Sequence, residues 1–262
     1  MKLPRWIEAG SGDPAMVLLH GVSTRAEAWA PLLPALATPG RRVLAWDLPG
    51  YDSADHRPQA GFESWCEGLA RMLDAADVAR CVLVGHSLGG MIALDFAARR
   101  PDRVEALALA CTTAGFGAAG GRRQREYLAR RLDPLDAGRT MADIAALEIP
   151  SMMHQPADPT LVARLGDLMA TIPPAAYAAA TRALTGFDRR AVIAELTMPV
   201  LCIAGRHDRI APPEVLALMA SRAPQGRSAM VDQAAHLAPF EAPGQFAALL
   251  DAFVVSVGDT NR

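Results

Sequence analysis

The sequence predicts an α/β fold, in which a mostly parallel, twisted sheet of about seven or eight strands is flanked by helices and carries an inserted helical cap. Three observations support this prediction. Short apolar runs alternate with longer amphipathic stretches, which is typical of parallel strands joined by helices. A serine stands between glycines where one such strand meets its helix. The segment 112–190 breaks the alternation, because its patterns are helical and no convincing strand occurs in it.

The apolar runs predict seven strands along the chain. They are expected at residues 4–8, 16–19, 42–46, 81–84, 104–109, 199–204 and 227–231. Helices are expected where apolar residues recur near the 3.6-residue period, at 27–37, 62–75, 91–99, 213–222 and 245–255. Because helices separate most successive strands, a sheet with helical crossovers is the expected arrangement.

We interpret the segment 112–190 as a cap, or lid, inserted into a core formed by residues 1–111 and 191–262. Several prolines divide this segment into short helices. They stand at positions 134, 150, 156, 159, 173 and 174. The alternative is a pair of long crossover helices, but crossovers rarely need so many residues.

Composition and charge exclude several classes of protein. The chain has 262 residues and is 51% hydrophobic, which is enough for one large domain with an insertion. Its net charge is −2 with dispersed acids and bases, which argues against nucleic-acid and membrane partners. No apolar run approaches the ~20 residues of a membrane span, and the first residues lack a signal-peptide core. We expect a cytoplasmic protein with a small-molecule substrate, and nothing in the sequence sets an oligomeric state.

Neither a cofactor nor a metal is expected. The cysteines Cys66, Cys81, Cys111 and Cys202 lack metal-ligand or redox spacing. The last three lie in or at the end of predicted strands and are interpreted as small core residues. Lys2 is the only lysine and lies near the terminus, which excludes a buried Schiff-base or phosphate-loop lysine.

The most informative stretch is Gly85-His86-Ser87-Leu88-Gly89-Gly90, which joins the apolar run 81–84 to the helix 91–99. A turn this tight holds its serine at strained backbone angles, and glycines at 85 and 89 remove side-chain collisions. The serine oxygen would project at the top of the sheet, beside a helix N-terminus that favours negative charge. The pattern predicts a nucleophile, Ser87, and a helix-capping serine in a glycine-rich turn is the alternative.

Asp208 and His236 follow two later strands, 199–204 and 227–231. The carboxyl ends of parallel strands lie at one edge of a sheet, so these side chains can meet Ser87. A serine hydroxyl needs a neutral imidazole to accept its proton and a carboxylate to orient that imidazole. The order Ser87, Asp208, His236 therefore predicts a Ser-His-Asp triad.

Two backbone N–H groups are expected to bind the oxyanion that acyl transfer generates. One belongs to Leu88, directly after the nucleophile, and the other to Val22, in the turn after the strand 16–19. The alternative is that His20-Gly21 forms only a tight turn. We expect His20 to brace this loop rather than to act as a base.

Three other titratable residues compete for the catalytic roles. Asp232 is close to His236 in sequence and is interpreted as a structural cap. His207 is expected to pack or to face solvent, and His86 is expected to point beneath the nucleophile.

Together, these motifs resemble the α/β-hydrolase family over most of the chain, from Met16 to about Val255. Supporting stretches are Leu19-His20-Gly21 with Trp29, Trp46-Asp47-Leu48-Pro49-Gly50-Tyr51 and residues 199–208. Within the family, the chain is similar to compact bacterial enol-lactonases and small-molecule carboxylesterases. The resemblance implies a serine hydrolase that forms an acyl-enzyme, and a serine nucleophile argues against attack on halides or epoxides.

Departures from the family pattern qualify these expectations. Asp52 stands where members often carry Gly, and the segment before Met16 is so short that the usual first strand is expected to be missing, leaving seven strands. Leu237 replaces the Trp that follows the histidine in many carbon–carbon bond hydrolases, and a Gly-rich oxyanion loop is absent after Gly21. Both differences disfavour cleavage of carbon–carbon bonds.

The cap is expected to cover the pocket and to set its shape. Six cap residues suggest an apolar lining, although such stripes are more often core. They are Met152, Met153, Leu161, Leu165, Leu168 and Met169. Arginines cluster at positions 122, 123, 125, 130 and 131, where a solvated face is the ordinary interpretation. The sharper hypothesis is that one of them binds a substrate carboxylate in a bidentate fork.

The sequence favours a serine hydrolase that cleaves an ester or lactone bond of a small molecule, which carries a carboxylate under the arginine hypothesis. The same triad could serve a carbon–carbon bond hydrolase of aromatic ring-cleavage products, an amidase, an acyltransferase or a perhydrolase. A ligand-binding receptor without catalytic activity is the alternative from another class, and the complete triad argues against it.

Overall fold

The computed structural model describes residues 5–51, 61–117 and 120–260. Within these residues, seven strands form one sheet in the order β1-β3-β2-β4-β5-β6-β7. They are β1 (Trp6–Ala9), β2 (Ala15–Leu19), β3 (Val43–Trp46), β4 (Cys81–His86), β5 (Val104–Ala110), β6 (Val200–Gly205) and β7 (Gly226–Val231). All neighbouring strands are parallel except β1 and β3. The predicted sheet is confirmed, and it has seven strands.

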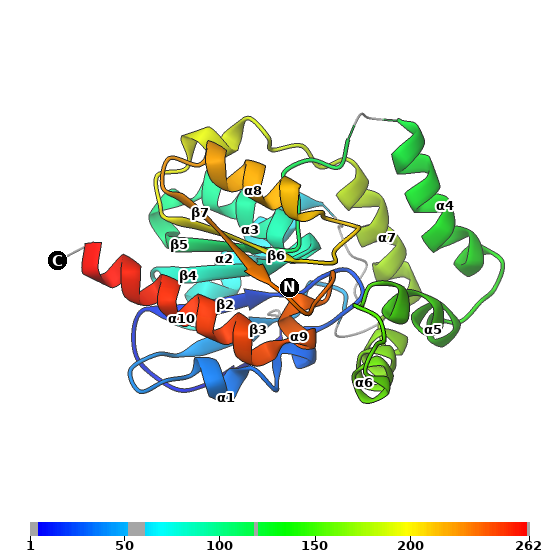
Figure 1. Cartoon of the computed structure of the whole chain (residues 1–262), viewed down its shortest axis with the longest axis horizontal. Coiled ribbons are helices and arrows are strands. Elements are labelled where there is room, and N and C mark those ends of the chain that lie inside the picture. The colour runs from blue at the N-terminus through cyan, green and yellow to red at the C-terminus, as the bar shows by residue number, and fades with distance from the viewer. Residues whose placement is uncertain (1–4, 52–60, 118–119, 261–262) are drawn as a thin grey trace.

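Helices cover both faces of the sheet, with α1 and α10 on one side and α3 and α8 on the other (Figure 1). The helices outside the middle segment are α1 (Leu33–Leu36), α2 (Phe62–Ala75), α3 (Leu88–Arg99), α8 (Pro213–Arg222), α9 (Ala238–Glu241) and α10 (Pro243–Thr260). Short 3₁₀ helices lie at Ala26–Trp29, Pro101–Arg103 and Val192–Glu195. Over the described part of the chain, no helix has both the length and the apolar character that crossing a bilayer requires.

The helix predicted at 27–37 is wrong. The structure has a 3₁₀ turn at Ala26–Trp29 and a single α-helical turn, α1, instead. Pro31 and Pro34 interrupt this stretch, because proline lacks the N–H that a continuing helix needs. The helices predicted at 62–75 and 213–222 match α2 and α8. The first strand is β1, and Pro4 and Asp52, which entered the predictions, lie outside the described residues.

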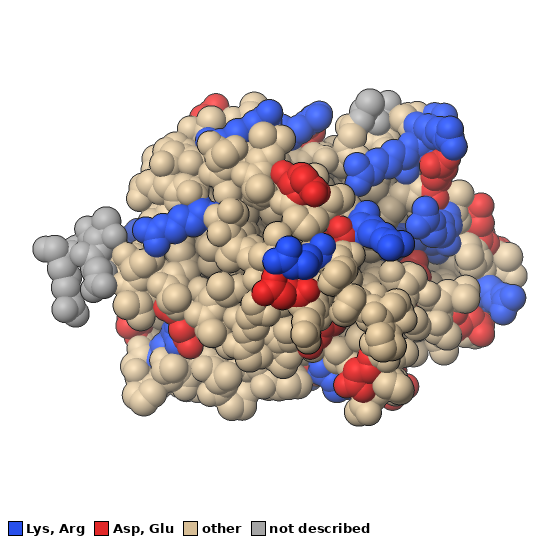
Figure 2. Space-filling model, viewed as in Figure 1, with Lys and Arg blue, Asp and Glu red and all other residues tan. Residues whose placement is uncertain are grey.

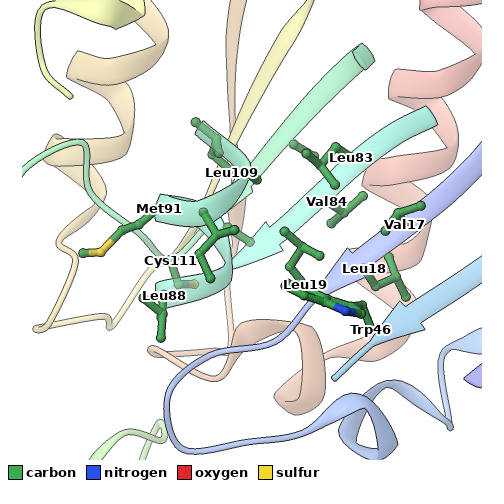
Figure 3. Close-up of a cluster of buried hydrophobic side chains, with 14 of the residues drawn as sticks. Val17, Leu18, Leu19, Trp46, Leu83, Val84, Leu88, Met91, Leu109 and Cys111 are labelled. Atoms are coloured by element: carbon green, nitrogen blue, oxygen red, sulfur yellow. The ribbon is translucent and has the colours of Figure 1, made fainter. Parts of the chain in front are cut away.

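The central strands form the core. Every residue of β2 is inaccessible to solvent, and β4 and β6 are buried throughout. Figure 3 shows apolar side chains of these strands, with Leu19 beside its register partner Trp46. A parallel strand covered on both faces needs a continuous apolar run, which explains why the runs were visible in the sequence. The four cysteines are buried free thiols, as predicted for three of them, and burial raises the pKa of Cys202 to about 12.

In the described residues between β5 and β6, four α-helices precede the 3₁₀ helix at Val192–Glu195, namely α4 (Arg122–Asp136), α5 (Met141–Ser151), α6 (Pro159–Ala170) and α7 (Pro174–Thr185). They gather at one end of the molecule, beside the sheet (Figure 1). Pro159 and Pro174 stand at the first positions of α6 and α7, where a missing N–H costs nothing. The helical character of this segment agrees with its sequence pattern, and its role as a separate cap stays a prediction.

Candidate active site

Ser87 occupies the sharp turn between β4 and α3. Its backbone has φ +52° and ψ −117°, a strained conformation for a residue other than glycine. A Cβ atom at Gly85 would lie 2.3 Å from the carbonyl oxygen of Gly89, and one at Gly89 would lie 2.3 Å from that of Leu19. The steric reason for both glycines is therefore confirmed, and the turn leaves the Ser87 side chain beside the N-terminus of α3.

The structure brings Ser87, Asp208 and His236 together. His236 Nε2 lies 3.0 Å from Ser87 Oγ, and His236 Nδ1 lies 2.9 Å from Asp208 Oδ2. Asp208 follows β6 and His236 follows β7, so the carboxyl edge of the sheet gathers the three side chains as expected. Because a carboxylate only accepts, Nδ1 carries the proton and Nε2 is free to accept the serine proton.

The Asp208 carboxylate is held in place by the backbone as well as by the imidazole. Its second oxygen, Oδ1, accepts hydrogen bonds from the N–H groups of Ile210 at 2.8 Å and Ala211 at 3.0 Å. Burial raises the pKa of Asp208, but His236 and these two N–H groups outweigh burial and leave the pKa below its ordinary value. Asp208 is therefore ionised at neutral pH, as an orienting carboxylate must be.

The loop after β2, which carries the proposed oxyanion donor Val22 and is called the oxyanion loop below, lies against the sharp turn at Ser87. Val22 and Leu88 both line the same cavity as Ser87. Tyr51 donates its hydroxyl hydrogen to the carbonyl oxygen of Val22 at 2.9 Å. His20 donates from Nδ1 to the carbonyl oxygen of Gly21 at 2.8 Å and accepts at Nε2 from the N–H of Leu48 at 2.9 Å. Burial lowers the pKa of His20, so a neutral ring braces the loop, in agreement with the sequence-based expectation.

The three residues that compete for the catalytic roles make other contacts. Asp232 is exposed and accepts hydrogen bonds from Arg206 at 2.5 and 2.9 Å. His207 stacks on His154 with ring centroids 4.0 Å apart. His86 lines the cavity next to Ser87, and its ring Nε2 bonds to the backbone carbonyl oxygen of His236. Among the residues that the structure describes, no three His, Cys, Asp or Glu side chains gather closely enough to hold a metal ion.

A mostly apolar cavity separates the sheet edge from α4 and α7. Of the six cap residues proposed as lining, only Met152 borders this cavity. Leu165 and Met169 are fully buried and belong to the packed core instead. Their helical stripe therefore packs within the predicted cap segment, and the lining comes from residues that the sequence did not single out, including Phe116, Tyr127 and Leu184.

The arginine cluster of α4 divides into two groups. Figure 2 shows basic side chains gathered over this helix, where the exposed members lie. Arg122 pairs with Glu126 in solvent, as a solvated face predicts. Arg123 and Arg131 line the cavity. Arg123 stands at the mouth, 5.6 Å from the Phe116 ring centroid, and forms no ion pair within the described part of the chain.

Arg131 belongs to a buried polar network that the sequence did not reveal. Its guanidinium pairs with Glu148, whose carboxylate also accepts the Tyr177 hydroxyl at 2.9 Å and the Ser23 hydroxyl at 3.3 Å. Ser23 follows Val22 directly, so the network connects α4, α5 and α7 to the oxyanion loop. No local pattern predicts these contacts, because Ser23 and Glu148 are 125 positions apart.

A sequence model of the alpha/beta hydrolase fold family matches residues 14–243. The chain belongs to this family. Solved structures that resemble it include an esterase from Thermogutta terrifontis (TM-score 0.86, 26% identity, covering 97% of this chain and 93% of that one). They also include the enol-lactonase from Burkholderia xenovorans (TM-score 0.85, 25% identity, covering 96% of both chains). The resemblance to enol-lactonases and esterases that the motifs indicated is confirmed.

Curated relatives point to more than one activity. A pimeloyl-[acyl-carrier protein] methyl ester esterase of Klebsiella pneumoniae is 32% identical over 241 residues, which cover 90% of this chain and 91% of that protein. The dihydrolipoyllysine-residue acetyltransferase component of the acetoin cleaving system of Pseudomonas putida is 32% identical over 258 residues. These cover 93% of this chain but only 64% of that protein, so the chain corresponds to a part of it.

Proposed function

We propose that this hydrolase cleaves an ester or lactone bond of a small molecule through an acyl-enzyme on Ser87. The continuous hydrogen-bonded chain from Ser87 through His236 to Asp208, at the floor of an apolar cavity, carries the proposal. The relatives named as methyl ester esterases and the structural neighbour named as an enol-lactonase support this bond type.

The proposed mechanism follows from the geometry. Ser87 Oγ attacks the carbonyl carbon of the substrate while His236 Nε2 takes the proton of the Ser87 hydroxyl. The oxyanion that forms accepts hydrogen bonds from the backbone N–H groups of Val22 and Leu88. His236 then returns the proton to the leaving alkoxide as the carbon–oxygen bond breaks. Water, deprotonated by the same imidazole, releases the acyl group and restores Ser87. Asp208 stabilises the imidazolium in both steps.

Turnover of a nitrophenyl ester tests this proposal. Ser87→Ala should abolish hydrolysis, and Ser221→Ala, at an exposed serine on α8, serves as the matched control and should retain wild-type rates. A panel of lactones, amides and dienoic diketones then separates the ester and lactone activity from its alternatives on the same triad. Hydrolysis that survives Ser87→Ala, or the absence of any turnover by the wild-type protein, would reject the proposal.

We further propose that the substrate carries a carboxylate distant from the scissile bond, and that Arg123 binds it. Arg131 is already compensated by Glu148, whereas the guanidinium of Arg123 has no acidic partner among the described residues. The aromatic face of Phe116 and the carbonyl of Ile210 hold the Arg123 side chain at the cavity mouth. A planar guanidinium in this position can bind a carboxylate with two parallel hydrogen bonds.

A matched pair of methyl esters tests this assignment, one with a terminal carboxylate and one with a terminal methyl group. Arg123→Gln should raise KM for the acidic ester by about 10-fold, as expected for loss of a partly exposed charged hydrogen bond, and leave KM for the neutral ester unchanged. Arg122→Gln, one position away in solvent, is the control. An unchanged ratio of the two KM values in Arg123→Gln would exclude the assignment.

A further inference from the structure

Glu241 contacts both neighbours of His236. It is the last residue of α9, and its carboxylate oxygen Oε1 accepts hydrogen bonds from the N–H of Ala235 at 2.9 Å and the N–H of Leu237 at 3.1 Å. The loop that carries the imidazole is therefore tied on either side of His236 to a single oxygen atom. Neither bond involves the imidazole itself.

The other oxygen of Glu241 reaches the helical insertion. Oε2 accepts the N–H of His154 at 2.6 Å. In the same region, the N–H of His236 donates to the carbonyl oxygen of Met152 at 2.9 Å. Residues 152–154 directly follow α5, so one hydrogen bond joins this segment to the backbone of His236 and a second joins it to Glu241.

The partial burial of Glu241 strengthens its hydrogen bonds to the three N–H groups. The side chain is half-buried, and burial raises its pKa, against the effect of its three N–H partners. Hydrogen bonds from N–H groups to a carboxylate are stronger than those between neutral groups. A buried N–H that loses its acceptor destabilises the folded protein. No other acceptor for the Ala235 and Leu237 N–H groups is present among the described contacts.

We propose that Glu241 is a positioning residue, which holds His236 in line between Ser87 and Asp208 and couples this alignment to the seating of the segment 152–154. The inference rests on the proposed esterase function. Loss of Glu241 leaves all three triad side chains present but lets the imidazole move. Because misplacement of a catalytic group by about 1 Å costs on the order of 100-fold in rate, kcat should fall while substrate binding is retained.

Three substitutions separate geometry from charge. Glu241→Ala removes all three acceptor contacts and should lower kcat by about 100-fold, with KM within about twofold of wild type. Glu241→Gln keeps the shape but offers one acceptor oxygen, so its amide NH₂ would face the His154 N–H, and kcat should fall by about 10-fold. Glu241→Asp keeps the charge but is one methylene shorter, so kcat should fall as in Glu241→Ala. Glu195→Gln, at an exposed glutamate before β6, is the matched control.

Hydrogen exchange provides the readout that does not depend on turnover. In Glu241→Gln, amides of residues 152–155 and 234–238 should both exchange at least about 10-fold faster than in wild type, while those of β4 should not change. The proposal fails if kcat of folded Glu241→Gln lies within twofold of wild type, or if the two segments exchange as in wild type. Should Glu241→Ala unfold, the isosteric glutamine variant decides the outcome. Failure of the esterase function itself is recognised separately, because the wild-type protein would then show no turnover that depends on Ser87.

Discussion

The ring of His86 donates a hydrogen bond from Nε2 to the backbone carbonyl oxygen of His236 at 2.7 Å, so a second, fully buried imidazole supports the first from beneath. A carbonyl oxygen only accepts, and the proton of the neutral His86 ring must therefore reside on Nε2. Burial, together with the neighbouring His236, lowers the pKa of His86 to about 3. His86 thus stays neutral wherever the enzyme works, and its role is structural.

This depressed pKa predicts an acid-dependent loss of stability. Between about pH 6.5 and pH 3 the unfolded chain binds a proton at His86 that the folded protein does not, so the free energy of unfolding falls as the pH is lowered. The contribution of this one group is at most about 1.4 kcal/mol per pH unit. His86→Gln removes the titration, and the slope of the free energy of unfolding against pH, from urea denaturation, should flatten by up to that amount. Parallel wild-type and His86→Gln slopes would contradict the prediction.

Asp208→Asn should reduce kcat by about 10³- to 10⁴-fold without unfolding the protein, because an amide no longer fixes the required imidazole tautomer. The contribution of the native Asp208 carboxylate to the free energy of unfolding also depends on pH. The folded-state pKa of Asp208 lies below the ordinary value of 3.8, so its contribution to stability is present above that pH and is lost as the pH falls below it. Asp232→Asn is the control, since this exposed carboxylate pairs with Arg206 in solvent. A comparable loss of kcat in Asp232→Asn would mean that the acid has been misassigned.

Gly21 is predicted to matter for activity more than for stability. A Cβ atom there would lie 3.0 Å from His86 Nδ1 and 3.2 Å from Ser87 Cβ, closer than ordinary contacts. Gly21→Ala should therefore displace the nucleophile or the oxyanion loop and lower kcat by about 10-fold or more, with a stability cost of about 1–3 kcal/mol. Gly166→Ala, in α6 where a Cβ atom would meet open space, should keep full activity and gain up to about 1 kcal/mol. Steady-state kinetics and thermal melts of the two variants measure the contrast.

The residues that could be predicted from the sequence share one property. Ser87, Asp208 and His236 lie after the carboxyl ends of β4, β6 and β7, and a parallel sheet gathers these ends at one edge. Local patterns therefore placed all three, and they also placed the glycines that the sharp turn requires. The apolar period alone predicts one helix at 27–37, but Pro31 and Pro34 prevent a continuous helix there.

The supporting residues could not be predicted in this way. Glu148 meets Ser23 across 125 positions, and Glu241 meets His154 across 87. Neither glutamate belongs to a motif whose spacing fixes its partner, and contacts of this kind depend on how the four helices between β5 and β6 seat against the sheet. The α4 arginines illustrate the same limit, since Arg123 and Arg131 look alike in the sequence, but Arg131 is buried against a carboxylate and Arg123 is exposed.

The Arg131–Glu148 pair supplies the last prediction, which concerns stability. Glu148→Leu leaves the buried guanidinium without a carboxylate and should cost about 3–5 kcal/mol. Arg131→Met should cost less, because the Glu148 carboxylate keeps the hydroxyl groups of Tyr177 and Ser23 as donors. The double variant should recover most of the loss, since no uncompensated charge remains buried. Urea denaturation measures these differences, and the solvent-exposed pair of Arg122 and Glu126 is the control, for which each single change should stay within about 0.5 kcal/mol. Equal costs for the two single changes, with no recovery in the double variant, would show that the pair contributes through packing rather than through its charges.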